Sequence, residues 1–307
     1  MANHRKEQRP ARVSLSQRAS PQTEGESLEQ PRSDSSISIF FPAYNDAGTI
    51  ASMVVLADRT LRRLTSDYEI IVVNDGSVDH TAQVLSELEA VYPRLRVVHH
   101  LKNMGYGSAL RSGLSSASKD LIFYTDGDAQ YDVRELEQLL PLMAEDVDVV
   151  NGYKISRSDP MHRVMIGKIY CWTVKMAFGI KITDVDCDFR LIRRLSYNRV
   201  RLYSTSGTIC VEMIKTFQDA GLRFAEAPVH HFHRAYGKSQ FFNFRRLFKT
   251  WRDLSRLWWR LVIKRQAQVV HPADQPAAIA QEEQRREFAR AHSAKAANTR
   301  GDERDSG

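Results

Sequence analysis

The chain has 307 residues, of which 42% are hydrophobic, and a formal net charge of +7. That hydrophobic content is enough for the core of one large α/β domain or of two small ones. The surplus charge is concentrated in residues 241–265, which carry six arginines and two lysines against one acid, so the folded domain lacks the basic patch with stacking aromatics that nucleic-acid binding requires.

The two ends of the chain differ in composition from its middle. Residues 1–36 are rich in Ser, Gln, Glu, Arg and Pro and have almost no aliphatic residues, and residues 267–307 repeat this bias. Neither end can bury enough apolar surface to order itself, so we expect two disordered tails around a folded region. The N-terminal residues include no apolar segment typical of a secretory signal, and no run approaches the roughly 18 apolar residues of a spanning helix. These features predict a cytoplasmic protein.

The first half of the folded region alternates strands with helices. The predicted strands are residues 37–41, 68–73, 95–99 and 121–125. The predicted helices are 49–64 and 81–90, and residues 103–116 are predicted to form a glycine-punctuated loop and a helix. This alternation implies right-handed crossovers and a mostly parallel sheet, in which ligands lie beyond the carboxyl ends of the strands. The polar loops at Tyr44, Asp75 and Asp126 all follow strands, so we expect them on one rim of the sheet.

The second half is more irregular. It predicts helices at 133–143, 164–178 and 206–220, and strands at 147–151 and 222–229. Gly179 marks the end of the second of these helices. Residues 183–194 place three acids just before an apolar and basic run, which favours the wall of an active site. The cysteines Cys171, Cys187 and Cys210 are too few for a disulfide framework or a zinc site and predict packed, reduced thiols.

An Asp-Gly-Asp motif directly follows the strand that ends at Thr125. The carboxylates of Asp126 and Asp128 can turn toward one hard cation while a diphosphate completes its coordination, as Mg²⁺ prefers. The same three residues are also ordinary turn chemistry after a strand. The motif alone therefore leaves a metal site and a solvated turn both open.

Six segments in order along the chain resemble one family. They are Phe41-Pro42-Ala43-Tyr44-Asn45-Asp46, Val73-Asn74-Asp75-Gly76-Ser77-Val78-Asp79, Asn103-Met104-Gly105-Tyr106-Gly107-Ser108-Ala109, Asp126-Gly127-Asp128-Ala129-Gln130, Asp186-Cys187-Asp188-Phe189-Arg190 and His233-Arg234-Ala235-Tyr236-Gly237-Lys238-Ser239. Together they resemble family 2 inverting glycosyltransferases with the GT-A fold, in particular the polyprenyl-phosphate (dolichyl- or undecaprenyl-phosphate) mannosyl- and glucosyltransferases. Asp46 stands where that family usually has Glu, and Asp188 where it often has Gly. Many bacterial relatives also continue into transmembrane helices.

The resemblance implies a donor site for a nucleoside-diphosphate sugar. Asp75 would accept a hydrogen bond from uracil or guanine, so GDP and UDP both stay open. Pro42, Ala43, Tyr44 and Asp46 would line the nucleotide. The residues implied as ligands of Mg²⁺ or Mn²⁺ are Asp126, Asp128 and Gln130, with the metal offsetting the charge that builds on the leaving diphosphate.

The resemblance also implies a lipid acceptor. A polyprenyl phosphate is already an anion, so it needs cationic steering more than a general base. We expect Arg190, Arg234 and Lys238 to surround the phosphates, with Ser239 as a hydrogen-bond donor. These three basic residues and Asp128 form the predicted catalytic set. The residues left as candidates for a base, or for contacts with the sugar or the acceptor, are Asp184, Asp186 and His233. Adjacent histidines point to opposite faces of a strand, so His230, His231 and His233 are not expected to share one metal.

A basic aromatic helix is predicted at residues 241–266, after a GT-A domain of residues 37–240. Its apolar residues recur at three- and four-residue steps and include Phe248, Trp251 and Trp258, while the other side is almost purely cationic. This composition is typical of a helix in a membrane interface. A helix packed on the domain, or one that binds a small membrane partner, is the alternative.

Taken together, the sequence predicts transfer of a hexose, mannose or glucose, from GDP or UDP to a polyprenyl phosphate by an enzyme at the inner face of the membrane. A family 2 enzyme that acts on a sugar hydroxyl, and a non-catalytic sugar-nucleotide-binding protein, are the alternatives. The Pro42 to Asp46 loop lacks the glycines and basic residues expected of a nucleotidyltransferase.

Overall fold

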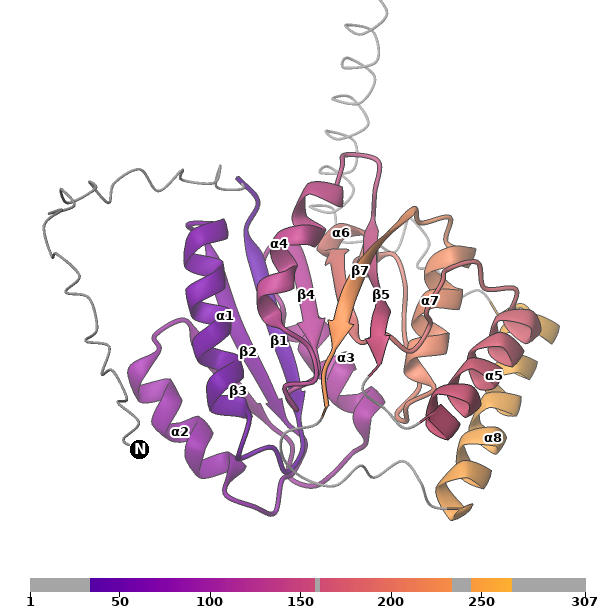
Figure 1. Ribbon diagram of the computed structural model, residues 1–307, viewed down its shortest axis with the longest axis horizontal. Coiled ribbons are helices and arrows are strands. Elements are labelled where there is room, and N and C mark those ends of the chain that lie inside the picture. The colour runs from indigo at the N-terminus through magenta and orange to yellow at the C-terminus, as the bar shows by residue number, and fades with distance from the viewer. Residues whose placement is uncertain (1–33, 158–160, 234–243, 267–307) are drawn as a thin grey trace, which may run out of the picture. The chain divides into compact units, whose positions relative to one another are not determined.

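The strands form one mixed sheet. The computed structural model describes residues 34–157, 161–233 and 244–266. Seven strands pair in the order β3-β2-β1-β4-β6-β5-β7 (Figure 1). They are β1 (Ile37–Ala43), β2 (Tyr68–Asn74), β3 (Leu95–His99), β4 (Leu121–Thr125), β5 (Val149–Arg157), β6 (Phe189–Arg193) and β7 (Phe224–His231). The predicted tails, apart from residues 34–36, lie outside the described residues.

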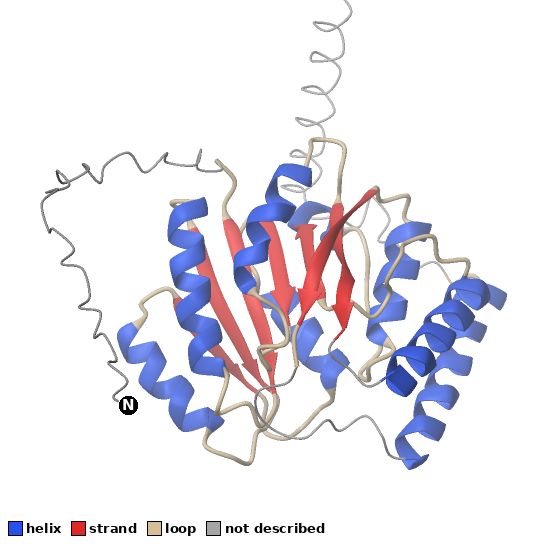
Figure 2. Ribbon diagram, in the orientation of Figure 1, coloured by secondary structure: helices blue, strands red, loops and turns tan. Residues whose placement is uncertain are grey.

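Helices cover both faces of the sheet (Figure 2). They are α1 (Ile50–Leu64), α2 (Thr81–Val91), α3 (Tyr106–Ser116), α4 (Leu136–Leu139), α5 (Met161–Phe178), α6 (Arg194–Asn198), α7 (Ile209–Asp219) and α8 (Phe244–Trp258). The 3₁₀ turns η1 (Val133–Glu135) and η2 (Leu140–Leu142) flank α4, and the π-helix η3 (Trp259–Ile263) continues α8. Helix α5 ends at Gly179, which adopts the predicted left-handed conformation with φ of 65°.

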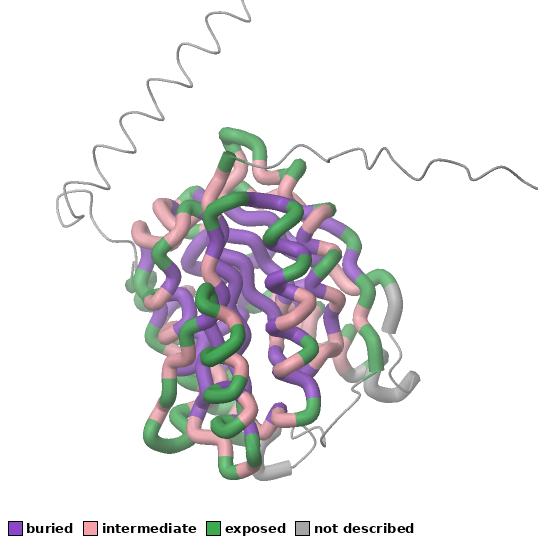
Figure 3. Tube along the Cα trace, turned by 90° about the vertical axis from the view of Figure 1, so that its left-hand side faces the viewer, coloured by how far each residue is buried: buried purple, intermediate pink, exposed green. Residues whose placement is uncertain are grey.

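The core follows from the two-residue period of the strands. Ile39 of β1 and Phe123 of β4 belong to a buried cluster with α1 and α4, whereas the adjacent Phe40 and Tyr124 belong to a second cluster with α3 and α7. Strands β1, β2, β4 and β6 are buried on both sides, as expected for a sheet between two layers of helices, whereas β3 and β7 are partly exposed. In Figure 3 the buried residues accordingly concentrate along the strands.

Strand β6 runs antiparallel to both of its neighbours, β4 and β5. The other four pairings of the described strands are parallel, so the predicted mostly parallel α/β sheet is confirmed. Thr125 at the end of β4 lies opposite Phe189 at the start of β6. The acidic segment before β6 is therefore brought to the rim where β1, β2 and β4 end, although the sequence did not predict a strand there.

The C-terminal helix packs on the domain through one part of its surface. Leu254 and Leu257 of α8 and Leu261 of η3 are buried in a cluster with residues of α5 and α7. The Trp258 indole nitrogen donates to the carbonyl of Ala177 at 2.8 Å, and Figure 1 shows α5 and α8 side by side. Phe248 remains 74% exposed. The predicted apolar stripe is thus split into a buried and an exposed part. No helix among the described residues is long and apolar enough to span a membrane.

Truncating a buried residue of this helix should destabilise the protein. Leu257 is 3% exposed, so Leu257→Ala removes a packed side chain and is expected to lower the free energy of unfolding by about 2–5 kcal/mol. The exposed Phe248 provides the matched control, and Phe248→Ala should change that free energy by less than about 0.5 kcal/mol. Urea unfolding of both variants gives the comparison, and equal effects would contradict the observed packing.

Candidate active site

Asp75 organises the loop that follows β3. Its carboxylate accepts hydrogen bonds from the backbone amides of Met104 and Gly105, both at 2.9 Å, and contacts Nδ1 of His100 at 2.6 Å. His100 in turn contacts the Ser112 hydroxyl through Nε2 at 2.8 Å. Asp75 is only 3% exposed, so its first role in this structure is to hold residues 100–105 in place. Its predicted contact with the nucleotide base stays a prediction.

The end of β1 joins the neighbouring loops. The Ala43 carbonyl accepts from the Asp75 amide at 2.9 Å, which fixes the β1 loop against the β2 loop. Asp46 is buried, accepts from the Tyr44 amide at 2.9 Å and donates its own amide to Thr81 at 3.0 Å. Its position thus reflects loop geometry, while the Tyr44 side chain next to it is 37% exposed and free to contact a ligand.

The Asp-Gly-Asp motif is held from both sides. The amide of Gly127 donates to the Pro42 carbonyl at 3.2 Å, and the Thr49 hydroxyl donates to the Gly127 carbonyl at 2.8 Å. The Asp128 carboxylate accepts from the Gln130 amide at 3.1 Å, which is the turn that the alternative interpretation predicted. The turn fixes the backbone and also directs both carboxylates to the rim.

Acidic side chains crowd around Asp126. Burial raises its pKa well above the usual range, and repulsion from Asp188 and Asp128 adds to this shift. The Tyr106 hydroxyl donates to Asp126 at 2.7 Å and opposes it. Negative charge concentrated among oxygen ligands fits a divalent cation. Within the described ranges no group of three or more His, Cys, Asp or Glu is arranged to hold an ion, so a bound diphosphate would have to supply the remaining ligands.

Arg190 requires a correction. It was predicted to contact a substrate phosphate, but it is fully buried. Its Nε donates to the Asn151 side chain at 2.6 Å, and its terminal nitrogens donate to the Tyr124 hydroxyl and the Val185 carbonyl. The guanidinium also lies 3.5 Å from the Asp188 carboxylate. The prediction was wrong because β6 directs Arg190 into the interior, where its guanidinium lies beside Asp188.

Asp184 and Asp186 lie in the loop that leads into β6. The Asp184 carboxylate is 3.8 Å from the Lys154 ammonium, which also donates to the Asp186 carbonyl at 2.7 Å. Burial raises the pKa of Asp186 to about 6; repulsion from Asp184 and Asp188 adds to the increase, and Lys154 opposes it. Asp186 thus has a pKa suited to a base near neutral pH, whereas Asp184 is occupied within the protein.

The loop after β7 reaches the same rim. The Phe232 amide donates to the Gln130 carbonyl at 2.8 Å, and the Gln130 side-chain nitrogen donates to the Phe232 carbonyl at 3.1 Å. His233, which follows, is exposed. His230 pairs with Glu135 at 2.7 Å, while the His231 ring packs edge-on against Tyr131, so the two adjacent histidines have different partners. The other predicted residues of this loop, Arg234, Lys238 and Ser239, lie outside the described residues.

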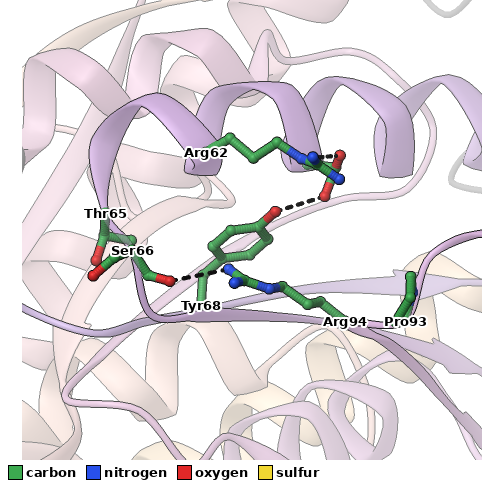
Figure 4. A pocket seen from close by; sticks show the side chains of 7 residues that line it. Arg62, Thr65, Ser66, Tyr68, Pro93 and Arg94 are labelled. Carbon is green, nitrogen blue, oxygen red and sulfur yellow. Dashed lines mark hydrogen bonds and ion pairs between the residues drawn. The ribbon is translucent and has the colours of Figure 1, made fainter. Parts of the chain in front are cut away.

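A cavity of about 450 Å³ lies away from this rim. It is lined by residues at the end of α1 and the beginnings of β2 and β3, and Figure 4 shows Tyr68 between Arg62 and Arg94. Because parallel strands begin at the edge opposite their carboxyl ends, this cavity is not the predicted donor site. The candidate site is therefore assigned from the positions of the sequence motifs and not from this cavity.

Two residues near Asp126 escaped the sequence analysis as site residues. Tyr106 lay in a quoted motif, but no role was assigned to it, and Asp188 was noted only as a departure from the family pattern. Asp188 accepts from the Cys210 thiol at 3.2 Å and contributes to the raised pKa of Asp126. All three cysteines are free. The signal for Asp188 was the third acid of its segment, but its approach to Asp126 depends on the antiparallel register.

A family comparison decides the identity of this site. The model of glycosyl transferase family 2 matches residues 38–201, which is more than half of the chain. The chain belongs to glycosyl transferase family 2. The resemblance to family 2 inferred from the six segments is thereby confirmed.

Individual relatives narrow the comparison. Undecaprenyl-phosphate 4-deoxy-4-formamido-L-arabinose transferase of Yersinia enterocolitica is 30% identical over 207 residues, which are 67% of this chain and 62% of that protein. The protein of the same name from Enterobacter sp. is 29% identical over 220 residues, 71% of this chain and 66% of that one. The chain therefore spans less than two thirds of the length of these relatives.

A solved structure supports the fold. Crystalline glucosyl-3-phosphoglycerate synthase from Mycobacterium tuberculosis superposes with a TM-score of 0.55 over 74% of this chain and 79% of its own, at 20% sequence identity. This likeness concerns the fold, and it confirms the predicted GT-A architecture.

The raised pKa of Asp186 predicts a pH-dependent stability difference. In the metal-free protein the Asp186 carboxyl binds its proton more tightly in the folded state than in the unfolded chain. The stability contributed by the protonated carboxyl is therefore present below about pH 4 and is lost as the pH rises through 6. In Asp186→Asn the side chain does not titrate, so the variant does not lose this stability as the pH rises. We expect the stability of the variant relative to the unmodified protein to increase between pH 4 and 6.5 in urea unfolding.

Asp132 provides a control in which the pKa is shifted in the opposite direction. Burial opposes ionisation of Asp132, but hydrogen bonds from Arg134 outweigh it and lower the pKa. The stability that this carboxylate contributes is present above its unfolded pKa and is lost in acid, so Asp132→Asn should become relatively less stable as the pH rises. The same trend in both variants would contradict the environment found for Asp186.

Proposed function

We propose that this chain transfers a hexose from a nucleoside-diphosphate sugar, GDP or UDP, to a polyprenyl phosphate with inversion, at the cytoplasmic face of a membrane. The observation that carries the proposal is the cluster of carboxylates around Asp126 at the rim where Asp75 and Tyr44 also lie. The names of the family relatives, which act on undecaprenyl phosphate, support the acceptor class. Mannose and glucose are the sugars that the sequence suggested.

The donor end of the site fits a divalent metal. Asp126 and Asp128 would hold Mg²⁺ or Mn²⁺, with Gln130 close by on the same turn. One structural neighbour was crystallised with Mn²⁺ and UDP, which supports this assignment. When bound, the metal offsets the charge that develops on the leaving diphosphate. Tyr106 holds Asp126 in place, and Tyr44 and Asp75 bound the space for the nucleotide.

The acceptor end of the site needs positive charge more than a base. A lipid phosphate carries its own nucleophilic oxygen as an anion, so the protein has to attract and orient it. Arg234, Lys238 and Ser239 are assigned to this task, with His233 at the start of the same segment. Arg190 no longer belongs to this set, because its buried guanidinium contributes by holding Asp188.

The surface formed by α5 and α8 supports a membrane location. Helix α5 exposes four large apolar side chains at helical spacing, Met165, Ile169, Trp172 and Met176, and α8 exposes Phe248 and Trp251. Lys249, Arg252 and Arg256 are exposed on α8 as well. We assign this α5–α8 surface, defined by these nine residues, to the membrane interface, where aromatic side chains enter the headgroup zone and cations attract anionic lipid.

A sugar hydroxyl as acceptor is the second candidate. A hydroxyl must lose its proton during attack, and the pKa of about 6 at Asp186 suits a general base near neutral pH. This candidate keeps the same donor site and changes only the acceptor.

Removing a carboxylate at the donor end should abolish transfer. Asp126→Asn or Asp128→Asn is expected to lower the rate by on the order of 10²-fold or more, because a metal contributes several kcal/mol of charge stabilisation. The assay incubates the protein with labelled GDP-mannose or UDP-glucose, with and without polyprenyl phosphate and Mg²⁺. Asp132→Asn, which changes an acid just beyond the motif, should retain activity.

Four outcomes distinguish the candidates. Lipid-dependent transfer that survives Asp186→Asn supports the phosphate acceptor. Loss of transfer in Asp186→Asn with donor binding intact favours a hydroxyl acceptor. Absence of lipid-dependent transfer with every donor tested sinks the leading proposal, and donor binding without release of nucleoside diphosphate identifies a sugar-nucleotide-binding protein.

The membrane assignment has its own test. Trp172→Ser and Trp251→Ser each remove an aromatic side chain from the α5–α8 surface and should weaken co-sedimentation with vesicles of mixed neutral and anionic lipid several-fold. Val91→Ser changes an exposed apolar residue of α2 and should have no effect, as should Asp126→Asn. Vesicle binding that is unchanged by both tryptophan substitutions would favour a protein partner for this surface.

A further inference from the structure

A buried acid connects the C-terminal helix to the domain. Glu212 of α7 is fully buried, and its carboxylate accepts from the backbone amides of Tyr203 at 3.1 Å and Ser204 at 2.6 Å. Arg260 of η3 donates to the same carboxylate at 2.5 Å, and its guanidinium lies 5.6 Å from the centre of the Tyr203 ring. One carboxylate therefore fixes both η3 and the beginning of the loop of residues 203–206.

The loop of residues 203–206 rests directly on the start of α3. The Thr205 carbonyl accepts from the Gly107 amide at 3.0 Å. A Cβ atom at Gly107 would lie 2.5 Å from the Ser204 carbonyl oxygen, and one at Gly105 would lie 2.4 Å from the Thr205 oxygen. Contact this close requires glycine at both positions, so a shift of the loop is transmitted to the backbone of α3.

The start of α3 is also where the donor site is assembled. Tyr106, between the two glycines, donates its hydroxyl to Asp126 at 2.7 Å. The Gly105 amide donates to the Asp75 carboxylate at 2.9 Å. Three consecutive residues thus connect the 203–206 loop with two residues of the candidate site.

We infer that the Glu212–Arg260 ion pair positions Asp126 by acting through the 203–206 loop and Tyr106. The C-terminal helix thereby helps to set the geometry of the donor site. Glu212 and Arg260 are positioning residues in this scheme, because neither contacts the reacting groups. The inference rests on the proposed function only in taking Asp126 as a metal ligand.

The physical basis is the cost of an uncompensated buried charge. Removal of Arg260 leaves the Glu212 carboxylate buried with only its remaining partners to stabilise it, which is strongly unfavourable. The carboxylate can then move toward water, which weakens its hold on the amides of Tyr203 and Ser204. An apolar contact of η3, such as that of Leu261, would attach the helix without this effect on the loop.

The experiment compares two arginines of the C-terminal helix. Arg260→Ala breaks the ion pair, whereas Arg252→Ala removes the same charge from a half-exposed position 3.6 Å from the neighbouring Asp253 carboxylate. In the metal-free protein, hydrogen exchange of the peptides that cover residues 203–207 and 104–108 should become at least about tenfold faster in Arg260→Ala and stay unchanged in Arg252→Ala. Arg260→Lys, which keeps the charge, should restore part of the protection.

Binding of Mn²⁺ alone, followed by electron paramagnetic resonance, is the second readout. Arg260→Ala should weaken the affinity for Mn²⁺ about tenfold, and Tyr106→Phe should weaken it as well. Because both substitutions act on Asp126 by one route, the double variant should bind Mn²⁺ no more weakly than the more affected single variant. Thermal unfolding and circular dichroism check that each variant is folded, and Glu212→Gln, which keeps the shape of the side chain, replaces Arg260→Ala if the latter fails to fold.

The outcomes separate the inference from the proposed function. Unchanged exchange in residues 104–108 of Arg260→Ala, or additive effects of Arg260→Ala and Tyr106→Phe on Mn²⁺ binding, would overturn the inference. The metal assignment fails if the unmodified protein binds no Mn²⁺, or if the Asp126→Asn variant binds it equally well. The hydrogen-exchange result would still decide whether the ion pair controls the start of α3.

Discussion

Repulsion among carboxylates at the end of β4 is the constraint on which the rest of the site depends. Burial raises the pKa of Asp126 well above its usual range, and the nearby charges of Asp188 and Asp128 add to the increase. Such an arrangement is unfavourable for the empty protein, so the fold has to hold each side chain by other means. The Gln130 backbone amide holds Asp128, the Tyr106 hydroxyl holds Asp126, and the Cys210 thiol and the Arg190 guanidinium hold Asp188. A cation bound among these groups would relieve the repulsion.

Arg190 shows how the interior supports this arrangement. A buried guanidinium is tolerated only when its charge and its N–H groups find partners, and Arg190 finds an amide oxygen, a hydroxyl, a carbonyl and the Asp188 carboxylate. Tyr124, one of these partners, pairs with Arg190 across β4 and β6 and leads directly to Asp126 two residues later. The arginine therefore fixes the antiparallel register that brings Asp188 to the rim. Its effect on the chemistry is indirect, through the position of an acid.

The sequence was most informative where local pattern determines structure. The strands before Tyr44, Asp75 and Asp126 were predicted within two residues of their observed ends, because short apolar runs and the polar turns that follow them are local signals. The grouping of their loops at one rim followed from the parallel crossovers. Strand β6 was missed because its five residues give no separate strand signal, and without its antiparallel pairing neither the burial of Arg190 nor the approach of Asp188 could be deduced. The contact of Glu212 with Arg260 spans 48 residues and likewise depends on tertiary packing.

The divided C-terminal helix connects these observations. Leu254, Leu257, Leu261 and Arg260 face the domain. The exposed side chains of Phe248, Trp251, Lys249, Arg252 and Arg256 face outward together with the apolar side chains of α5. A helix that only anchored the protein to a surface would not need an ion pair with a fully buried glutamate, because apolar packing supplies attachment without the cost of desolvating two charges. The pair is retained at a place where the same carboxylate holds two backbone amides of the loop that touches α3. The outward face and the carboxylate cluster are thus joined through a short series of directional contacts, and a lipid-bound helix and an ordered donor site are expected to favour each other.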